Sequence, residues 1–222
     1  MERTTPSGLS PRKKPRQARA AVTVDAIFEA CIQLLISDGL DRLTTTRVAE
    51  RAGVSVGTMY QYFPHKHALI YALNERYLEA LAARVEARCA ALEGAPIGDM
   101  VEALIDTYWQ AKMERMDATL ALYQSMAGLN NEALIAAFVA RVDTATSAMF
   151  DSAGDPSIAD IQSVNLTLVT VIFGAVRHVF ERRLSREEAE PIRRQLVLMC
   201  RTYLASVTRE ADIGTTDCFP AR

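Results

Sequence analysis

The segment "GVSVGTMYQYFPHKHAL", residues 53–69, combines glycines, small hydroxyl side chains and tyrosines within a few turns of chain. Ser55, Gly57 and Thr58 leave the start of a short helix small and able to form hydrogen bonds. A helix N-terminus presents unpaired N–H groups and a positive dipole end, which suits phosphate. Tyrosine adds a rigid ring whose hydroxyl can reach a phosphate and whose face can cover a thymine methyl group. This combination favours a surface that contacts DNA.

Signals on either side place this segment in the second of two short helices. Thr44 and Ser55 are predicted N-caps. Gly53 separates the helices, and Pro64 ends the second one because proline disfavours helical geometry at the residue before it. Two short helices joined in this way have the layout of a helix-turn-helix over residues 44–63, whose second helix enters the major groove.

The helical period divides this second helix into an inner and an outer face. Met59 and Phe63, at positions i and i+4, are predicted to pack on the preceding helices. The side chains left for outside contact are Val56, Gly57, Thr58, Tyr60, Gln61 and Tyr62. The fold alone explains the caps and the core residues, whereas exposed tyrosines beside Lys66 in a basic segment favour DNA contact.

The stretch from Leu43 to Leu69, "LTTTRVAERAGVSVGTMYQYFPHKHAL", closely resembles the helix-turn-helix signature of the tetracycline-repressor (TetR) family of bacterial regulators. The resemblance covers residues 20–80, with the threonine pair, "AGVS", "GT", "YF" and the lysine in register. In that family the proteins are homodimers whose paired recognition helices enter successive major grooves of a double-stranded DNA operator. The resemblance therefore implies a regulator of transcription.

Carried over residue by residue, the resemblance implies DNA contacts from both short helices. Thr45 and Thr46 would contact the DNA backbone, residues 56–58 would approach bases, and the tyrosines with Lys66 would bind phosphates. The full predicted set is Thr44, Thr45, Thr46, Arg47, Ser55, Val56, Gly57, Thr58, Tyr60, Gln61, Tyr62 and Lys66. Because Val56 and Gly57 lack a hydrogen-bonding side chain, specificity is expected from the neighbouring polar residues or from DNA shape. Members often have Asn, Ser or Asp as a cap before the lysine, and here His65 predicts a weaker cap.

Helical periodicity continues through the rest of the chain, without a convincing alternating strand. The predicted helices run from Thr23 to Gly39 and over 44–53, 55–63, 66–92, 98–115, 117–127, 131–152, 157–184 and 186–207, the last with a Ser185–Glu188 capping box. The predicted fold is all-α, with an N-terminal three-helix helix-turn-helix DNA-binding domain followed by a helical ligand-binding and dimerisation bundle. The predicted parts are a flexible basic arm (1–19), the DNA-binding domain (20–80), the ligand-binding and dimerisation domain (81–207) and a C-terminal tail (208–222). The arm is either a solvated tail or a further DNA contact.

The second domain is expected to form a homodimer through its last two long helices. Residues 164–180, "VNLTLVTVIFGAVRHVF", are apolar nearly all round, so this helix needs cover on more than one side. The final helix offers a matching stripe of Ile192, Leu196, Met199, Cys200 and Tyr203. A pair of helices with this much apolar surface would associate with a second copy.

Methionine and aromatic residues in the middle helices suit an adaptable cavity for an unidentified small-molecule effector, apolar or amphipathic. The candidates are Trp109, Met113, Tyr123, Met126, Phe173 and His178. Ordinary core packing would also explain each of these residues singly. Such an effector would release a repressor from its operator, and an activator fits the sequence as well.

Composition narrows the classes of function. The 222 residues are half hydrophobic and carry a formal net charge of −2, which argues against a general polyanion binder. Basic residues are in excess over 1–67 and acidic residues over 68–222. Four well-separated cysteines without a CxxC pair favour reduced thiols in the cytoplasm. The longest uncharged stretch, from Ile161 to Val176, is predicted to be too short and too polar to span a membrane.

Catalysis finds little support in the sequence. There is no HExxH, no GxSxG and no glycine-rich phosphate loop. We therefore expect no enzymatic activity, no metal and no cofactor. Two alternatives stay open: an architectural DNA-binding protein without an effector, which would show weak sequence preference, and an α-helical enzyme, which would need an isolated catalytic group.

Overall fold

The computed structural model describes residues 18–126, 131–153, 158 and 160–213. Within these ranges the chain is helical and contains no strand, which confirms the predicted all-α fold. The predicted arm over residues 1–19 and the tail over 208–222 lie mostly outside the described residues. Residues 18 and 19 begin the first helix, and residues 208–213 end the last one.

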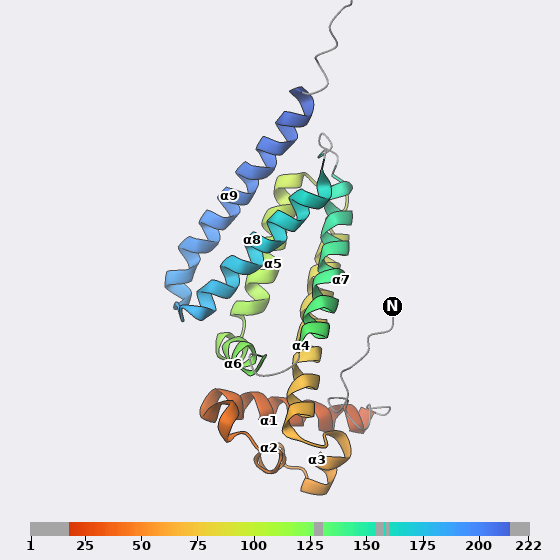
Figure 1. The fold of residues 1–222 in the computed structure, drawn as a ribbon, viewed down its shortest axis with the longest axis vertical. Helices are drawn as coiled ribbons and strands as arrows, with labels where there is room; N and C mark the ends of the chain where they lie inside the picture. The colour runs from red at the N-terminus through yellow and green to blue at the C-terminus, as the bar shows by residue number, and fades with distance from the viewer. Residues whose placement is uncertain (1–17, 127–130, 154–157, 159, 214–222) are drawn as a thin grey trace, which may run out of the picture. The chain divides into compact units, whose positions relative to one another are not determined.

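The order of elements is shown in Figure 1. The helices are α1 (Ala18–Arg42), α2 (Thr45–Ala52), α3 (Val56–Tyr62), α4 (Lys66–Ala90), α5 (Ile97–Met113), α6 (Met116–Met126), α7 (Glu132–Asp151), α8 (Ile161–Glu181) and α9 (Arg186–Ile213). Most predicted boundaries lie within a few residues of these. The largest differences are at α1, which begins before Thr23, and at α9, which continues past residue 207.

The chain divides into two compact units, residues 1–80 with 115–138 and residues 81–114 with 139–222. Helices α4 and α7 each contribute to both units. The predicted boundary after residue 80 coincides with one of these divisions. Helix α6 was predicted to belong to the second domain, whereas in the structure it groups with the first unit because it packs on α1. The functional division of the chain stays a prediction.

Local signals determine where the helices of the first unit begin and end. The Thr44 and Ser55 side-chain oxygens accept backbone N–H groups three residues ahead, at 3.2 and 3.0 Å, so both predicted N-caps are confirmed. Gly39 and Gly53 have φ values of 76° and 67°, which close the regular part of α1 and the end of α2. The turns on both sides of α2 are therefore built into the sequence.

One apolar cluster holds the first unit together. Ile27 of α1, Val48 of α2 and Met59 of α3 are fully buried, and Leu122 of α6 is 2% exposed. Helix α1 packs on α2 and α6, and α2 packs on α3. The two short helices thus share one apolar core with α1 and α6.

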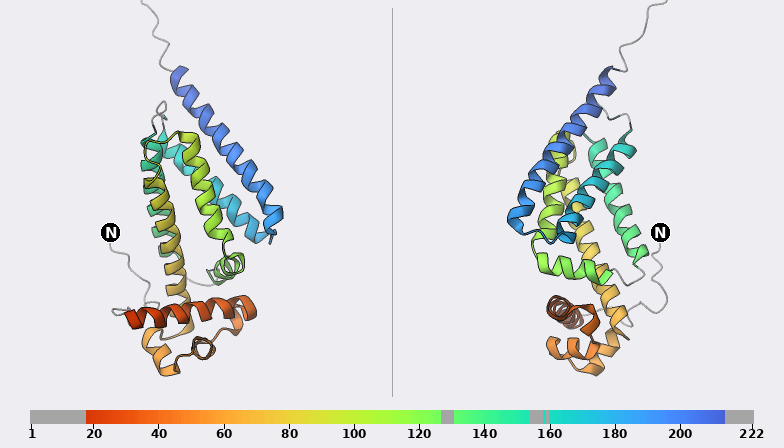
Figure 2. Two further views of the ribbon diagram at one scale, coloured as in Figure 1. Left: turned by 180° about the vertical axis from the view of Figure 1, so that it is seen from behind. Right: turned by 60° about the vertical axis from the view of Figure 1, so that its left-hand side comes forward.

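In the second unit, α9 lies beside α5 and also contacts α8, as Figures 1 and 2 show. Two arginines of α9 form ion pairs with carboxylates of α5. Arg193 lies 2.6 Å from Asp106, and Arg201 lies 2.5 Å from Glu102. These pairs run along the length of the α5–α9 contact.

The start of α9 has the predicted capping box. The Ser185 backbone N–H donates to the Glu188 carboxylate at 2.8 Å, and the Glu188 N–H donates to the Ser185 hydroxyl oxygen at 3.2 Å. These hydrogen bonds lower the pKa of the Glu188 carboxyl. The prediction of a reciprocal cap is confirmed.

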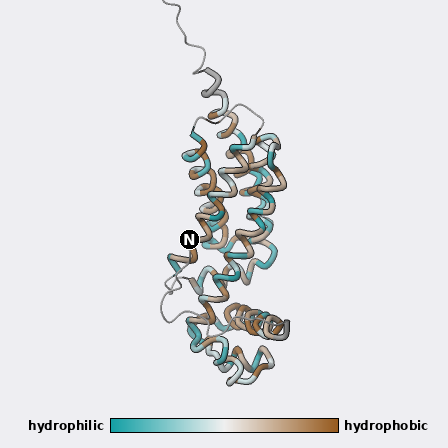
Figure 3. Tube along the Cα trace, turned by 90° about the vertical axis from the view of Figure 1, so that its right-hand side faces the viewer, coloured by the Kyte–Doolittle hydropathy of each residue, from teal (hydrophilic) through white to brown (hydrophobic). Residues whose placement is uncertain are grey.

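Three helical stretches, Ala20–Arg42, Glu132–Asp151 and Ile161–Glu181, are long and apolar enough to cross a membrane by length and composition. The prediction that residues 161–176 are too short and too polar is wrong on these two measures, because the helix continues to Glu181. In the structure α8 buries part of its apolar surface within the second unit, with Ile172 fully covered. Figure 3 shows hydrophobic and hydrophilic residues alternating along the helices.

An ion pair joins Arg115, the residue before α6, to Glu29 of α1 and leads to a prediction about pH. Arg115 donates two hydrogen bonds to the Glu29 carboxylate, at 2.8 and 2.9 Å, and lowers the pKa of that carboxyl from its ordinary 4.5. A lowered pKa gives stability above the unfolded-state pKa that is lost as the pH falls through the folded-state pKa. Glu29→Gln should lower the thermal unfolding midpoint at pH 7 by roughly 1–3 °C, since the pair is exposed.

The measurement is thermal unfolding followed by circular dichroism from pH 7 to pH 3. The difference between wild type and Glu29→Gln should shrink below pH 4.5, where the wild-type carboxyl becomes protonated. Glu93→Gln serves as the control, because Glu93 is exposed and its carboxyl forms no hydrogen bond or ion pair within the described part of the chain. If the difference in unfolding midpoint between wild type and Glu29→Gln stays constant from pH 7 to pH 3, the proposed contribution of the charged Glu29–Arg115 pair is contradicted.

Candidate nucleic-acid interface

The start of α3 is exposed and rich in hydroxyl groups. Ser55 Oγ accepts the Thr58 N–H at 3.0 Å and lies 2.8 Å from the Thr58 hydroxyl. Ser55, Val56 and Gly57 are exposed, and Thr58 is half-buried. The helix therefore begins at the surface with small side chains, as predicted.

Neither the backbone conformation of Gly57 nor its contacts with the described residues require glycine at this position. It is the second residue of α3, and glycine in a helix is less stable than alanine by up to about 1 kcal/mol. Its backbone does not adopt a positive φ, and an added Cβ would meet only Ser55 Oγ at 3.7 Å, an ordinary contact. Close approach of a binding partner to the helix backbone gives a physical reason for this residue.

The outer face of α3 carries Tyr60 and Gln61. Tyr60 is 43% exposed, and Gln61 is also exposed. The Thr45 hydroxyl of α2 donates to the Tyr60 hydroxyl at 3.5 Å. Thr45 itself is buried, whereas Thr44 and Thr46 are exposed. Thr45 is thus placed to support Tyr60, which corrects the expectation that its side chain is available for direct contact.

Tyr62 also differs from the prediction. Its side chain is buried, and its ring centroid lies 6.3 Å from that of Phe63. Because α3 turns once in 3.6 residues, positions 59, 62 and 63 share one face. The prediction that Tyr62 is exposed is wrong. Its ring belongs to the inner face of α3 together with Met59 and Phe63.

Arg47 is engaged within the chain. Its guanidinium donates to Asp38 at 2.5 Å and to the carbonyl oxygen of Arg42 at 3.0 Å. These bonds tie the first turn of α2 to the end of α1. A base contact from Arg47 would require both hydrogen bonds to break, so the geometry favours a positioning role for this residue.

Lys66 is the first residue of α4 and is half-buried. His65 precedes it and accepts the Ala68 N–H at Nδ1, at 3.1 Å. The imidazole therefore caps α4 at the position where a weaker cap was expected. An accepting Nδ1 places the proton of the neutral ring on Nε2.

The structure does not bring the predicted effector-binding residues together in one described cavity. Tyr123 and Met126 belong to the first unit, whereas Trp109, Met113, Phe173 and His178 belong to the second. Trp109 and Met113 line one cavity. The Phe173 ring stacks on Tyr108 with centroids 4.0 Å apart. His178, also a predicted effector contact, has a side chain that is 65% exposed and lies beside Glu181.

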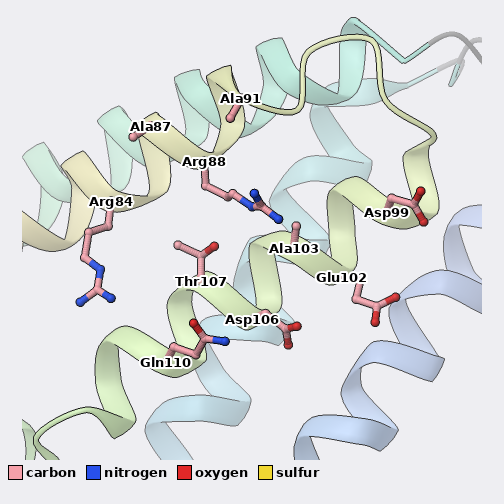
Figure 4. Close-up of a pocket in the computed structure, with 10 residues that line it drawn as sticks. All are labelled: Arg84, Ala87, Arg88, Ala91, Asp99, Glu102, Ala103, Asp106, Thr107 and Gln110. Atoms are coloured by element: carbon pink, nitrogen blue, oxygen red, sulfur yellow. The ribbon is translucent and has the colours of Figure 1, made fainter.

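Two adjoining cavities in the second unit are lined mainly by charged and polar groups. The larger, about 870 Å³, lies between α4 and α5 (Figure 4). The other, about 550 Å³, shares Arg84, Asp106 and Gln110 with it and reaches Trp109. Neither cavity was predicted, because the predicted effector site consists mainly of apolar and aromatic residues. Arginines one turn apart on a predicted helix, Arg84 and Arg88, were the available signal.

A buried lysine was also missed. Lys112 is 1% exposed, and its ammonium nitrogen lies 5.3 Å from the centroid of the Tyr108 ring. Burial lowers the pKa of Lys112 to about 7, because the charged form loses its hydration. Its place in the sequence between Trp109 and Met113 could have drawn attention to it. For metals, the described residues contain no group of three or more His, Cys, Asp or Glu side chains that could hold an ion.

Comparison with known proteins supports the identity of both parts of the chain. Residues 27–73 match the family model "Bacterial regulatory proteins, tetR family", and residues 96–204 match "Tetracyclin repressor-like, C-terminal domain". A curated relative, the nucleoid occlusion factor SlmA of Actinobacillus pleuropneumoniae serotype 5b (strain L20), is 37% identical over 83 residues. That match spans 37% of this chain and 39% of the relative.

Solved structures extend the similarity over most of the chain. A TetR-family transcriptional regulator from Streptomyces coelicolor is 26% identical, with a TM-score of 0.60, and the match covers 83% of this chain and 99% of that one. A second structure, from Mesorhizobium loti MAFF303099, is 17% identical, with a TM-score of 0.68 and coverage of 86% and 98%, and it supports the fold. The two family models together cover more than half of the residues and both belong to one family. The chain is therefore a member of the TetR family of helix-turn-helix, DNA-binding regulators of transcription.

Proposed function

We propose that this protein is a ligand-responsive repressor that binds a palindromic operator as a homodimer and is released by a small-molecule effector. The observation that carries the DNA-binding part is the start of α3, where Gly57 is exposed without a structural need for glycine. A helix that keeps its backbone bare in this way suits insertion into the major groove.

The described side chains support distinct roles at this interface. Thr46, Thr58 and Gln61 offer hydrogen bonds to base edges or backbone, and Val56 offers an apolar contact. Tyr60 and Lys66 suit phosphate. Thr44, Thr45, Ser55 and Arg47 position α2 and α3 through the hydrogen bonds described above. Tyr62 contributes through the core that anchors α3.

Exposed apolar residues on the last two helices support the proposed homodimer. Leu166 of α8 is 60% exposed, and Leu198 and Met199 of α9 are 60% and 51% exposed. Leu196 and Cys200, which were predicted for the same stripe, are instead buried within the chain. Side chains of this size gain roughly 1.5–3 kcal/mol each on full burial. A second copy is the partner that we propose to cover them.

An effector would act only to the extent that it prefers the form that does not bind DNA. Helix α4 is a direct route for such a preference, because one continuous helix carries Lys66 at its start and Arg84 and Arg88 near its end. A ligand that tilts α4 would move Lys66 away from its phosphate. The same tilt would shift the recognition helices of the two copies, so that they would no longer match half-sites spaced by about 34–36 Å or a multiple.

A second candidate is a DNA-bound architectural protein without an effector. It is favoured by the similarity to nucleoid occlusion factors, although the chain spans only 39% of the first of these relatives. The acidic second part and the net charge of −2 favour the sequence-specific regulator. We also propose a cytoplasmic location and no enzymatic role, in keeping with the family.

Selection from a library of random DNA duplexes distinguishes the two candidates. The repressor should enrich an inverted repeat whose half-sites lie about 10 base pairs apart, centre to centre, or a multiple of that spacing. Analytical ultracentrifugation of the purified complex should give two chains per duplex or an even multiple. Enrichment of no motif would favour the architectural candidate, and a single unrepeated half-site bound by one chain would contradict the dimer.

Replacing Gly57 by alanine should separate folding from DNA binding. Gly57→Ala should raise the stability of the protein by up to about 1 kcal/mol, because alanine favours the helix and the added methyl has room. The same methyl should lower affinity for the selected duplex at least tenfold by holding α3 away from the groove. Thermal unfolding and fluorescence anisotropy of a labelled duplex measure the two effects. If Gly57→Ala binds the selected duplex with unchanged affinity, the proposed close approach of Gly57 to DNA is contradicted.

Lys66 is proposed to contact the DNA backbone, so its effect should depend on salt and not on sequence. Lys66→Ala should weaken binding to selected and random duplexes by a similar factor and reduce the slope of log K against log salt by about one. Arg182→Ala is the control, since Arg182 is an exposed cation at the end of α8. An equal change of slope in both variants would assign the effect to overall charge.

A further inference from the structure

The contact between α7 and α8 encloses polar side chains. Asn165 of α8 is 3% exposed, and its side-chain N–H donates to the backbone carbonyl oxygen of Asp143 of α7 at 3.5 Å. Thr146, one turn further along α7, is fully buried. All three residues belong to the second unit. Hydrogen-bonding groups are thus withdrawn from water where two helices of this unit meet.

This contact has more hydrogen-bond acceptors than donors. The Asp143 Oδ1 and Asn165 Oδ1 atoms are both buried, and no hydrogen bond reaches either of them within the described part of the chain. The Thr146 hydroxyl does not serve them, because it donates to the Val142 carbonyl oxygen of its own helix at 2.8 Å. A buried acceptor without a donor lowers the stability of the folded state. The contact therefore lacks a donor.

A proton on Asp143 would supply that donor. An ionised carboxylate only accepts hydrogen bonds, whereas a protonated carboxyl group also donates one. Protonation also removes a negative charge that is partly withdrawn from water. In agreement, burial raises the pKa of the Asp143 carboxyl above its ordinary 3.8. One proton thus corrects both the missing donor and the buried charge.

No cation in the neighbouring elements offsets the charge of the Asp143 carboxylate in the described part of the chain. Helix α8 has no charged or titratable residue between Ile161 and Val176. Helix α4 reaches α7 through the Glu86 carboxylate, which pairs with Arg141 of α7 at 2.5 Å. One turn further along α4, burial raises the pKa of the Cys89 thiol to about 11, so this group is neutral. The Asp143 carboxylate therefore gains more from a proton than from its charged neighbours.

We propose that Asp143 binds a proton at the α7–α8 contact and that this proton strengthens the packing of α8 on α7. The second unit is then held together more firmly in mildly acidic than in neutral solution. Asn165 is followed directly by Leu166, an exposed residue that the proposed homodimer would cover. A link to assembly rests on the proposed function, whereas the proton site does not.

Replacing Asp143 by asparagine tests the site, because the amide keeps the shape of the side chain, carries no charge and always has a donor. A raised folded-state pKa gives stability below the unfolded-state pKa that is lost as the pH rises through the folded-state pKa. Wild type and Asp143→Asn should therefore unfold at similar temperatures at pH 3.5. At pH 7 the variant should unfold roughly 1–4 °C higher, as measured by circular dichroism.

Glu93→Gln is the control for loss of one exposed negative charge from the same unit, and its difference from wild type should not grow with pH in this way. Carbon-13 NMR of the carboxyl carbons gives a direct reading, with the Asp143 signal assigned by its absence in Asp143→Asn. Its titration midpoint should lie above 3.8, and the Asn165 side-chain amide should shift at the same midpoint.

Three results would overturn the proposal. The first is a difference between wild type and Asp143→Asn that does not increase with pH. The second is a carboxyl midpoint at or below 3.8. The third is stabilisation of wild type, and not of the variant, by sodium chloride relative to choline chloride at equal ionic strength, because it would assign the buried oxygens to a metal ion.

Analytical ultracentrifugation at pH 5 and pH 7.5 tests the link to assembly. The ratio of the dimer affinities at these two pH values should be about threefold larger in wild type than in Asp143→Asn. An equal ratio together with a raised carboxyl midpoint would establish the proton site and contradict its role in assembly. If no dimer forms at either pH, the proposed homodimer is contradicted, and the unfolding and NMR measurements still decide the proton site.

Discussion

Helix α3 is too short to be stable alone, and this constraint organises the first unit. A helix of seven residues cannot persist in water without tertiary contacts. Its geometry is therefore set by the burial of Met59 and Phe63, which are 0% and 2% exposed, and by the Ser55 cap. Helix α1 and the start of α4 provide the apolar surface that these residues need. The outer face of α3 is free to vary only because the inner face is fixed.

Features that depend on near neighbours in sequence could be predicted. The caps at Thr44 and Ser55, the left-handed glycines at 39 and 53 and the Ser185–Glu188 box each need only residues within one helical turn. The helical class followed from periodicity over long segments. The residues that resemble the TetR signature belong to the same short segments. The resemblance therefore covered the DNA-binding domain and gave fewer expectations for the second domain.

Features that depend on which elements meet could not be predicted. The Arg47 guanidinium could have pointed to DNA, and only the position of Asp38 at the end of α1 shows that it is engaged. Tyr62 was assigned to the surface because two anchors already seemed to fill the inner face of so short a helix. His178 was misjudged for the same reason, since the side of α8 that stays exposed depends on helices distant in sequence.

Salt is expected to act on this protein in two places: on the ion pairs between α5 and α9, and on the contact with DNA. Both arginines and their carboxylate partners are partly exposed, so dissolved ions screen their attraction. The same ions compete with protein cations for DNA phosphates. A change in salt therefore acts on the attachment of α9 as well as on the DNA contact. If α9 also joins two copies of the chain, the salt response of the complex includes that of the assembly.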